Sequence, residues 1–138
     1  MPPKEVLEEV AAWIEKAESD FRNIKLVLPA DDAPFDTVCY HAQQAAEKYL
    51  KALLTFCGIP FRRTHDLPEL LLLLPSSSSV PAEVGDLAEL TDAAMASRYP
   101  YMGTKYDRKM AEDAVRTAEL VKSSVLDELS NEGYAHPA

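Results

Sequence analysis

The sequence predicts an all-α protein: an antiparallel up-down bundle of four main helices plus one short helix. Apolar residues recur every three or four positions along most of the 138 residues, which is the period of a helix and not that of a strand. Prolines and glycines fall at the ends of these periodic stretches, where helices stop. The links between the stretches are short, which favours an antiparallel bundle. We expect one domain over residues 1–130 and a flexible tail over residues 131–138.

The first helix is expected to follow Pro2-Pro3 and to end at Pro29. Its apolar stripe steps by three and four residues and consists of Val6, Val10, Trp13, Ala17, Phe21, Ile24 and Leu28. This stripe indicates one face packed against the rest of the bundle.

A second helix is expected over about residues 35–57, with Gly58 as its stop. Its apolar line consists of Val38, Ala42, Ala45, Tyr49 and Leu53, widened by Ala46, Leu50 and Leu54. On a helical wheel, a stripe of polar residues falls on the other side: His41, Gln44, Lys48, Lys51 and Thr55. The pattern predicts a packed helix with an exposed polar edge.

The remaining helices are bounded by turn residues. Asp66 and Glu69 form a capping pattern for a short helix that ends at Leu74, and a serine-rich link follows at residues 75–79. A fourth helix is expected from Ala82 to Ala96, with Val84, Leu87, Leu90 and Ala94 facing inward. Residues 97–104 contain Pro100 and Gly103 and cannot continue it. The last helix begins near Asp107, and its stripe consists of Ala111, Ala114, Ala118, Val121, Val125 and Leu129.

The net charge of −9, from 14 basic and 23 acidic residues, argues against a protein that coats duplex nucleic acid by charge alone. The charge is nevertheless segregated. Residues 37–65 carry one acid and four bases, a net +3, and residues 98–109 also carry one acid and four bases, again a net +3. Residues 66–97 hold six acids and no base. A local anion site is therefore compatible with the acidic total, although solvated surface charge explains either basic segment alone.

The compartment is expected to be the cytoplasm. Cys39 and Cys57 are 18 positions apart, or about 27 Å along one helix, which is too far for a disulfide. The N-terminus lacks an apolar signal segment, and the run from Leu70 to Leu74 is too short to cross a membrane. The cysteines have no paired ligand at zinc-site spacing, and there is no glycine-rich phosphate loop, so we expect neither metal nor cofactor.

Three segments carry a family resemblance. Residues 40–54 (YHAQQAAEKYLKALL), Thr64-His65-Asp66-Leu67, and Ser97-Arg98-Tyr99-Pro100 together resemble the HEPN domain family, over roughly residues 6–125. The resemblance implies four main helices plus a short one, and a homodimer. It also implies a minimal nucleotidyltransferase partner, because many members are encoded beside one and some of these pairs act as toxin and antitoxin.

The sequence departs from the ribonuclease members of that family at one place. Those members carry an arginine followed four to six positions later by a histidine, and here Arg98 is followed at residues 102–105 by Met, Gly, Thr and Lys. Histidine is the side chain best able to take and give a proton near neutral pH. The sequence thus resembles the non-nuclease branch, for which we expect no catalytic residue and weak or no binding of RNA.

We expect the ligand, a nucleotide or a phosphate group, to be bound by His41, Gln44, Lys48, Lys51, His65, Arg98 and Tyr99. A guanidinium can clamp a phosphate while a neighbouring ring stacks on a base. Structural roles stay open for most of these residues: His41 bonded across the bundle, His65 bracing a loop, the lysines paired with Glu47, and Arg98 in an ion pair at the end of its helix. Two other functions also stay open, a divergent metal-independent RNase toxin using Arg98 with His41 or His65, and a pure interaction domain.

Overall fold

The computed structural model describes residues 1–80 and 84–137, and in this part the chain is helical without a β-strand. The helices are α1 (Lys4–Val27), α2 (Phe35–Phe56), α3 (Leu67–Leu73), α4 (Val84–Ala96) and α5 (Arg108–Asn131), with a 3-10 turn η1 at Pro100–Met102. The predicted fold class, four main helices plus a short one, is confirmed.

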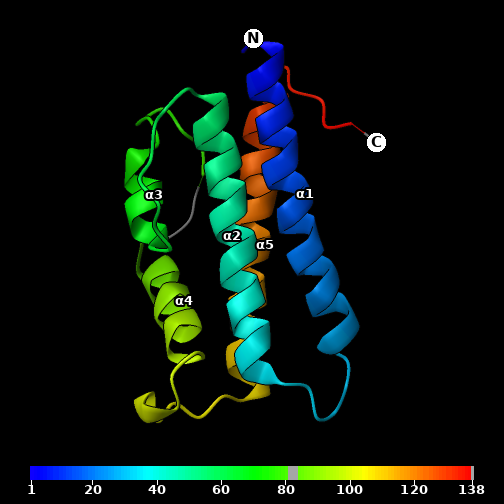
Figure 1. Ribbon diagram of the computed structural model, residues 1–138, viewed down its shortest axis with the longest axis vertical. Helices are drawn as coiled ribbons and strands as arrows, with labels where there is room; N and C mark the ends of the chain where they lie inside the picture. Colours follow the sequence, from blue (N-terminus) through cyan, green and yellow to red (C-terminus); the bar gives the residue numbers. More distant parts are fainter. Residues whose placement is uncertain (81–83, 138) are drawn as a thin grey trace.

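Helix α2 lies at the centre of the molecule, with α1 on one side, α3 and α4 on the other, and α5 behind it (Figure 1). The main helices alternate in direction along the chain, so α2 and α5 run the same way. At one end, the Arg108 side chain donates a hydrogen bond to the Leu28 carbonyl at 2.9 Å and lies 4.9 Å from the Phe35 ring centroid. At the other end, the Phe56 and Tyr134 rings meet edge to face.

The core is built from α2 outward. Its small residues Ala42, Ala45, Ala46 and Ala52 are fully buried, as are Ala111 and Ala118 of α5. Small side chains at facing positions let helix backbones approach closely, and larger residues such as Tyr49, Leu50 and Leu53 fill the space between. Truncating one of these leucines to alanine is expected to cost about 2–5 kcal/mol.

The helix boundaries have local causes. Asp66 accepts a hydrogen bond from the Glu69 backbone N–H at 3.2 Å, which confirms the predicted cap of α3. Asp107 does the same for α5, accepting from Met110 N–H at 2.8 Å. After α2, Gly58 adopts a left-handed φ of 69°, a conformation that disfavours other residues.

The remaining differences from the sequence are local. The expected start of the fourth helix at Ala82 lies outside the described residues, as does the side chain of Val84. Leu87, Leu90 and Ala94 are buried as predicted, whereas the turn η1 was not predicted. Within residues 1–80 and 84–137, no helix is both long and apolar enough to cross a membrane.

Candidate ligand-binding site

One group of the predicted residues points from α2 toward α1. The Lys48 ammonium donates to Asp20 Oδ2 at 2.6 Å, and His41 Nδ1 lies 2.8 Å from Asp20 Oδ1. The Asp20 side chain is 9% exposed, and those of Lys48 and His41 are 20% and 27% exposed. Both predicted ligand groups therefore already have a carboxylate partner, and the network ties α2 to α1.

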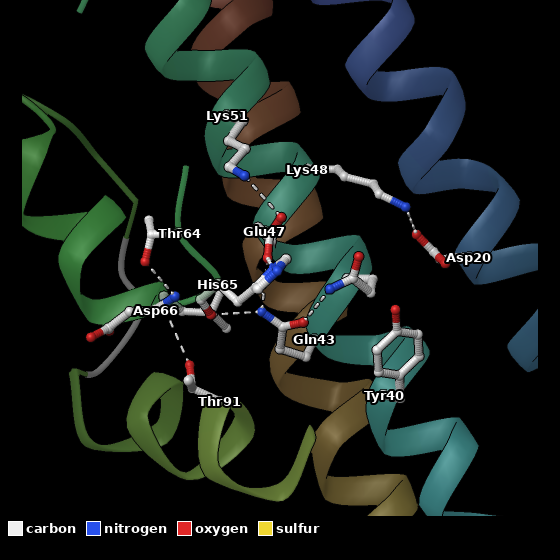
Figure 2. A network of polar contacts seen from close by, with 12 residues as sticks. Asp20, Tyr40, Gln43, Glu47, Lys48, Lys51, Thr64, His65, Asp66 and Thr91 are labelled. Atoms are coloured by element: carbon white, nitrogen blue, oxygen red, sulfur yellow. Dashed lines mark hydrogen bonds and ion pairs between the residues drawn. The ribbon is translucent and has the colours of Figure 1, made fainter. Parts of the chain in front are cut away.

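A second network lies on the side of α2 that faces the loop before α3 (Figure 2). The buried Glu47 carboxylate accepts from the Lys51 ammonium at 2.9 Å and from the Gln43 amide at 3.1 Å, and His65 Nδ1 lies 2.7 Å from it. Gln43 also donates to the His65 backbone carbonyl at 2.8 Å, and Gln44 donates to the Gln43 side-chain oxygen at 2.7 Å. The predicted residues His65, Gln44 and Lys51 thus belong to a network around Glu47 that fixes the loop on α2.

The helical wheel predicted Lys51 on an exposed edge, but in the structure this residue is buried. Its side chain is only 7% exposed, and its ammonium lies 5.4 Å and 5.6 Å from the ring centroids of Trp13 and Phe61. Two aromatic faces and a carboxylate therefore enclose this charge. A phosphate group could reach it only by displacing Glu47 or the rings.

Arg98 follows the C-terminus of α4, in the segment that Pro100 prevents from continuing as a helix. Its guanidinium lies 4.7 Å from the Tyr40 ring centroid and donates a hydrogen bond to the Tyr40 hydroxyl at 2.7 Å. Among the described residues, no carboxylate forms an ion pair with it. The Tyr40 ring, which is neutral, orients the guanidinium. Because Arg98 is exposed, its charge faces solvent.

A hollow of about 380 Å³ opens beside this arginine, and we refer to it as the Arg98 hollow. Four of the predicted residues line it: Gln44, His65, Arg98 and Tyr99. His41, Lys48 and Lys51 are not among its lining residues. The Tyr99 ring is part of an exposed aromatic pair with Tyr101, at a centroid distance of 5.4 Å.

Sequence reasoning missed several lining or supporting residues, notably Tyr40, Gln43, Asp66, Thr91 and Asp92. It also missed Asp20, although a signal for it was present. Asp20 lies three residues after Ala17 and four before Ile24, so it occupies the buried stripe of α1. An acidic residue on an apolar stripe predicts a buried partner.

The cysteines do not contribute reactive groups to this region. Burial, with Asp36 and Asp107 nearby, raises the pKa of the Cys39 thiol to about 11, so this thiol stays protonated. Among the described residues, no three His, Cys, Asp or Glu side chains converge to hold a metal ion. The groups that line the Arg98 hollow can bind an anion, form hydrogen bonds and stack on a base, and His65 adds an imidazole.

Comparisons with known proteins agree with this architecture. The model of the HEPN domain family matches residues 10–129. The fold is similar to the crystal structure of TT1696 from Thermus thermophilus, at 29% identity and a TM-score of 0.77, over 87% of this chain and 98% of that one. It is also similar to ST0689, an archaeal HEPN homologue, at 26% identity and a TM-score of 0.69, over 87% of this chain and 97% of that one. No curated protein matches the chain.

Proposed function

Because this chain belongs to the HEPN domain family, we propose that it is a non-catalytic nucleotide- or phosphate-binding HEPN module. The observation that supports this most is the guanidinium of Arg98. It lies at the edge of an open hollow, it is oriented by Tyr40, and it forms no ion pair with a described carboxylate. Such a group binds phosphate oxygens through two parallel hydrogen bonds.

The other lining residues favour a nucleotide over free phosphate. The exposed ring of Tyr99 offers a surface on which a base can stack. Asp66 and Asp92 also line the hollow, and their carboxylates repel an anion but accept hydrogen bonds from ribose hydroxyls or base amino groups. We therefore propose that the phosphates contact Arg98 and His65, while the nucleoside extends toward the carboxylates and Tyr99.

His41, Lys48 and Lys51 take part in this proposal through α2. Each is held by a buried carboxylate, and the two networks fix the helix that carries Tyr40 and Gln44. We propose that they position the site, and that Gln44, His65, Arg98 and Tyr99 contact the ligand.

Calorimetric titration with ATP and with other nucleotides tests the binding site. We expect Arg98→Ala to weaken binding roughly tenfold to a hundredfold, because it removes a charge-assisted contact worth about 1.5–3 kcal/mol. Arg22→Ala is the matched control, since Arg22 is exposed on α1 and does not line the hollow. Absence of heat from the wild type, alone and with a nucleotidyltransferase partner, would discard the proposal.

The family membership also leads us to propose a minimal nucleotidyltransferase as partner, in a pair that resembles a toxin and its antitoxin. The genes on either side of this one test this at little cost. If a nucleotidyltransferase gene is adjacent, co-expression should yield a complex that survives size-exclusion chromatography. Separate elution of the two proteins would contradict the partnership.

We further propose a homodimer. Large apolar side chains remain in water on several helices, including Leu26 of α1 at 72% exposure and Leu72 of α3 at 76% exposure. Burying such residues in a subunit interface is favourable by about 25 cal/mol per Å² of apolar surface. Light scattering should give about twice the chain mass of 15.3 kDa, and a monomer mass at micromolar concentration would contradict the dimer.

A second candidate function, the divergent RNase using Arg98 with His41 or His65, is favoured by two contacts. His65 lines the Arg98 hollow, and its Nδ1 lies 2.7 Å from the Glu47 carboxylate. The bond between His41 and Asp20 is of the kind that orients a catalytic imidazole, and the His41 ring lies 5.4 Å from the Tyr40 ring that holds Arg98. However, Asp20 is shared with Lys48, and no histidine follows Arg98 at the spacing of the family's nucleases. We therefore expect no cleavage of RNA at a useful rate.

Incubation with single-stranded RNA and with tRNA separates the two functions. Cleavage by the wild type that disappears in Arg98→Ala and in either His41→Ala or His65→Ala would establish the RNase and overturn the non-catalytic proposal. Cleavage that none of these substitutions changes would indicate a contaminating nuclease. An inactive wild type that still binds nucleotide supports the binding module.

A further inference from the structure

A second hollow lies between α4 and α5, away from α1, and we call it the α4–α5 groove. Its volume is about 610 Å³. The apolar lining comes from facing rows of the two helices and from η1: Leu90, Ala93 and Met95 of α4, Met102 of η1, and Met110 and Ala114 of α5. Leu90, Ala93 and Ala96 of α4 are three positions apart, and Met110 and Ala114 of α5 are four apart, so these residues form strips along the two helix axes. Met95 lies at the edge of the α4 strip.

Methionines give this strip an adaptable surface. Met95 and Met102 are 54% and 50% exposed, although such side chains are usually buried. Methionine is unbranched and polarisable, and it adjusts its shape to the side chains of a bound helix. An exposed strip of this kind is suited to the apolar face of a partner helix.

Within the described part of the chain, the charged residues that line the groove are all acidic. Three of them, Asp86, Glu89 and Asp92, lie on α4, and none of the three forms an ion pair with another described residue. The fourth carboxylate, Asp113 of α5, is already paired with Lys109 and Arg116. Like charges three residues apart destabilise a helix, so cations placed along α4 would relieve this repulsion.

We propose that the α4–α5 groove binds a basic amphipathic helix of a partner protein. Apolar residues of that helix, spaced at i, i+3, i+4 and i+7, would cover the methionine strip, and flanking lysines or arginines would face Asp86, Glu89 and Asp92. A second copy of this chain in a two-fold contact is a poorer occupant, because symmetry would bring the same acidic rims together. Asp92 and Met95 also line the Arg98 hollow, so the bound helix would lie next to it.

A synthetic helical peptide tests the proposal directly. The probe is a fluorescein-labelled peptide of about five turns, with leucines along one face and lysines beside them. Its comparator carries glutamates in place of the lysines. We expect the basic peptide to bind with a marked dependence on salt, and the acidic peptide not to bind.

Charge-reversed variants locate the binding surface. Asp86→Lys/Glu89→Lys should weaken binding of the basic peptide about tenfold, since two attractions become repulsions. Glu9→Lys/Glu15→Lys makes the same change in net charge on exposed positions of α1, and it should alter binding less than about twofold. Should the first variant fail to fold, Asp86→Asn/Glu89→Gln serves in its place, with a loss of about threefold expected.

Three results would overturn the proposal. The basic peptide could fail to bind the wild type, the basic and acidic peptides could bind equally well, or the groove and α1 variants could lose the same amount of affinity for the basic peptide. Nucleotide titration of the same variants keeps this test separate from the proposed function. None of the substituted positions lines the Arg98 hollow, so loss of peptide binding with unchanged nucleotide binding assigns the effect to the groove.

Discussion

Removal of the Glu47 carboxylate should destabilise this protein more than removal of any surface acid. The Lys51 side chain is 7% exposed, and in Glu47→Leu its ammonium loses the carboxylate that it contacts. Leaving one member of a buried ion pair without its partner typically costs about 3–5 kcal/mol. The rings of Trp13 and Phe61 continue to face the ammonium, and His65 is 62% exposed and can turn to water. We therefore expect a loss near the lower limit, about 3 kcal/mol.

The double variant Glu47→Leu/Lys51→Met separates the pair from its surroundings. With both charges replaced by apolar groups of similar size, no buried charge of this pair is left, and stability should return to within about 1 kcal/mol of the wild type. Lys51→Met alone should cost about 1–2 kcal/mol, because Glu47 keeps its contacts with His65 and Gln43. These values predict a coupling energy of about 3–5 kcal/mol between the two positions.

Urea unfolding followed by circular dichroism measures all of these free energies. Glu8→Leu is the matched control: it makes the same substitution in the exposed pair of Glu8 with Lys4, and it should cost less than about 1 kcal/mol. If Glu47→Leu lowers the free energy of unfolding by no more than this control does, Glu47 does not compensate a buried charge. If the double variant loses the sum of the two single losses, the residues act independently, which also refutes the reasoning.

Three further predictions concern single side chains. Burial alone would raise the pKa of Glu18, but hydrogen bonds from Tyr49 and a neighbouring lysine outweigh it and keep this pKa below its usual range. A lowered carboxyl pKa stabilises the fold above the unfolded-state value, and this stabilisation is lost as the pH falls through the folded value. Tyr49→Phe should therefore cost about 1 kcal/mol at neutral pH and less at about pH 3, and equal losses in urea unfolding at both pH values would contradict it. Cys57 is exposed and Cys39 is buried with a raised pKa, so Ellman's reagent should titrate one thiol in the native protein and the second only after unfolding; two fast thiols would contradict the burial. Asp107→Ala removes the cap of α5 and should lower stability by about 0.5–2 kcal/mol in thermal unfolding, whereas Asp107→Asn should be nearly neutral.

The helices could be predicted because each signal lies within one segment. The stripe of α1 and the proline at residue 29 determine its face and its end without reference to the rest of the chain. The cap at Asp66 depends only on the residue three positions later. Such local signals leave the turn η1 unpredicted, because a single turn of three residues has no apolar period to detect.

The site could be predicted only in part, because its geometry comes from contacts across the fold. Arg98 was identified from its neighbours in sequence, but its hydrogen-bond partner, Tyr40, lies 58 positions away on α2. Likewise, the sequence pairs Lys51 with Glu47 by helical spacing, whereas the enclosure of that pair by Trp13 and Phe61 requires α1 and the loop after α2. Residue type and period cannot supply either fact.

The predicted polar stripe of α2 combines residues that face two different neighbours, α1 and the loop before α3. At about 100° per residue, His41 and Lys48 differ in direction by only about 20°, and both reach Asp20 on α1. Lys51 is rotated about 80° from His41, toward Glu47 and the loop before α3. Each ammonium is therefore held by a different carboxylate, and that of Lys51 is also enclosed by the rings of Trp13 and Phe61, so the two lysines do not form one shared ligand site. It follows that alanine at either lysine should lower stability through its own carboxylate partner, whereas nucleotide affinity should respond to residues that line the Arg98 hollow.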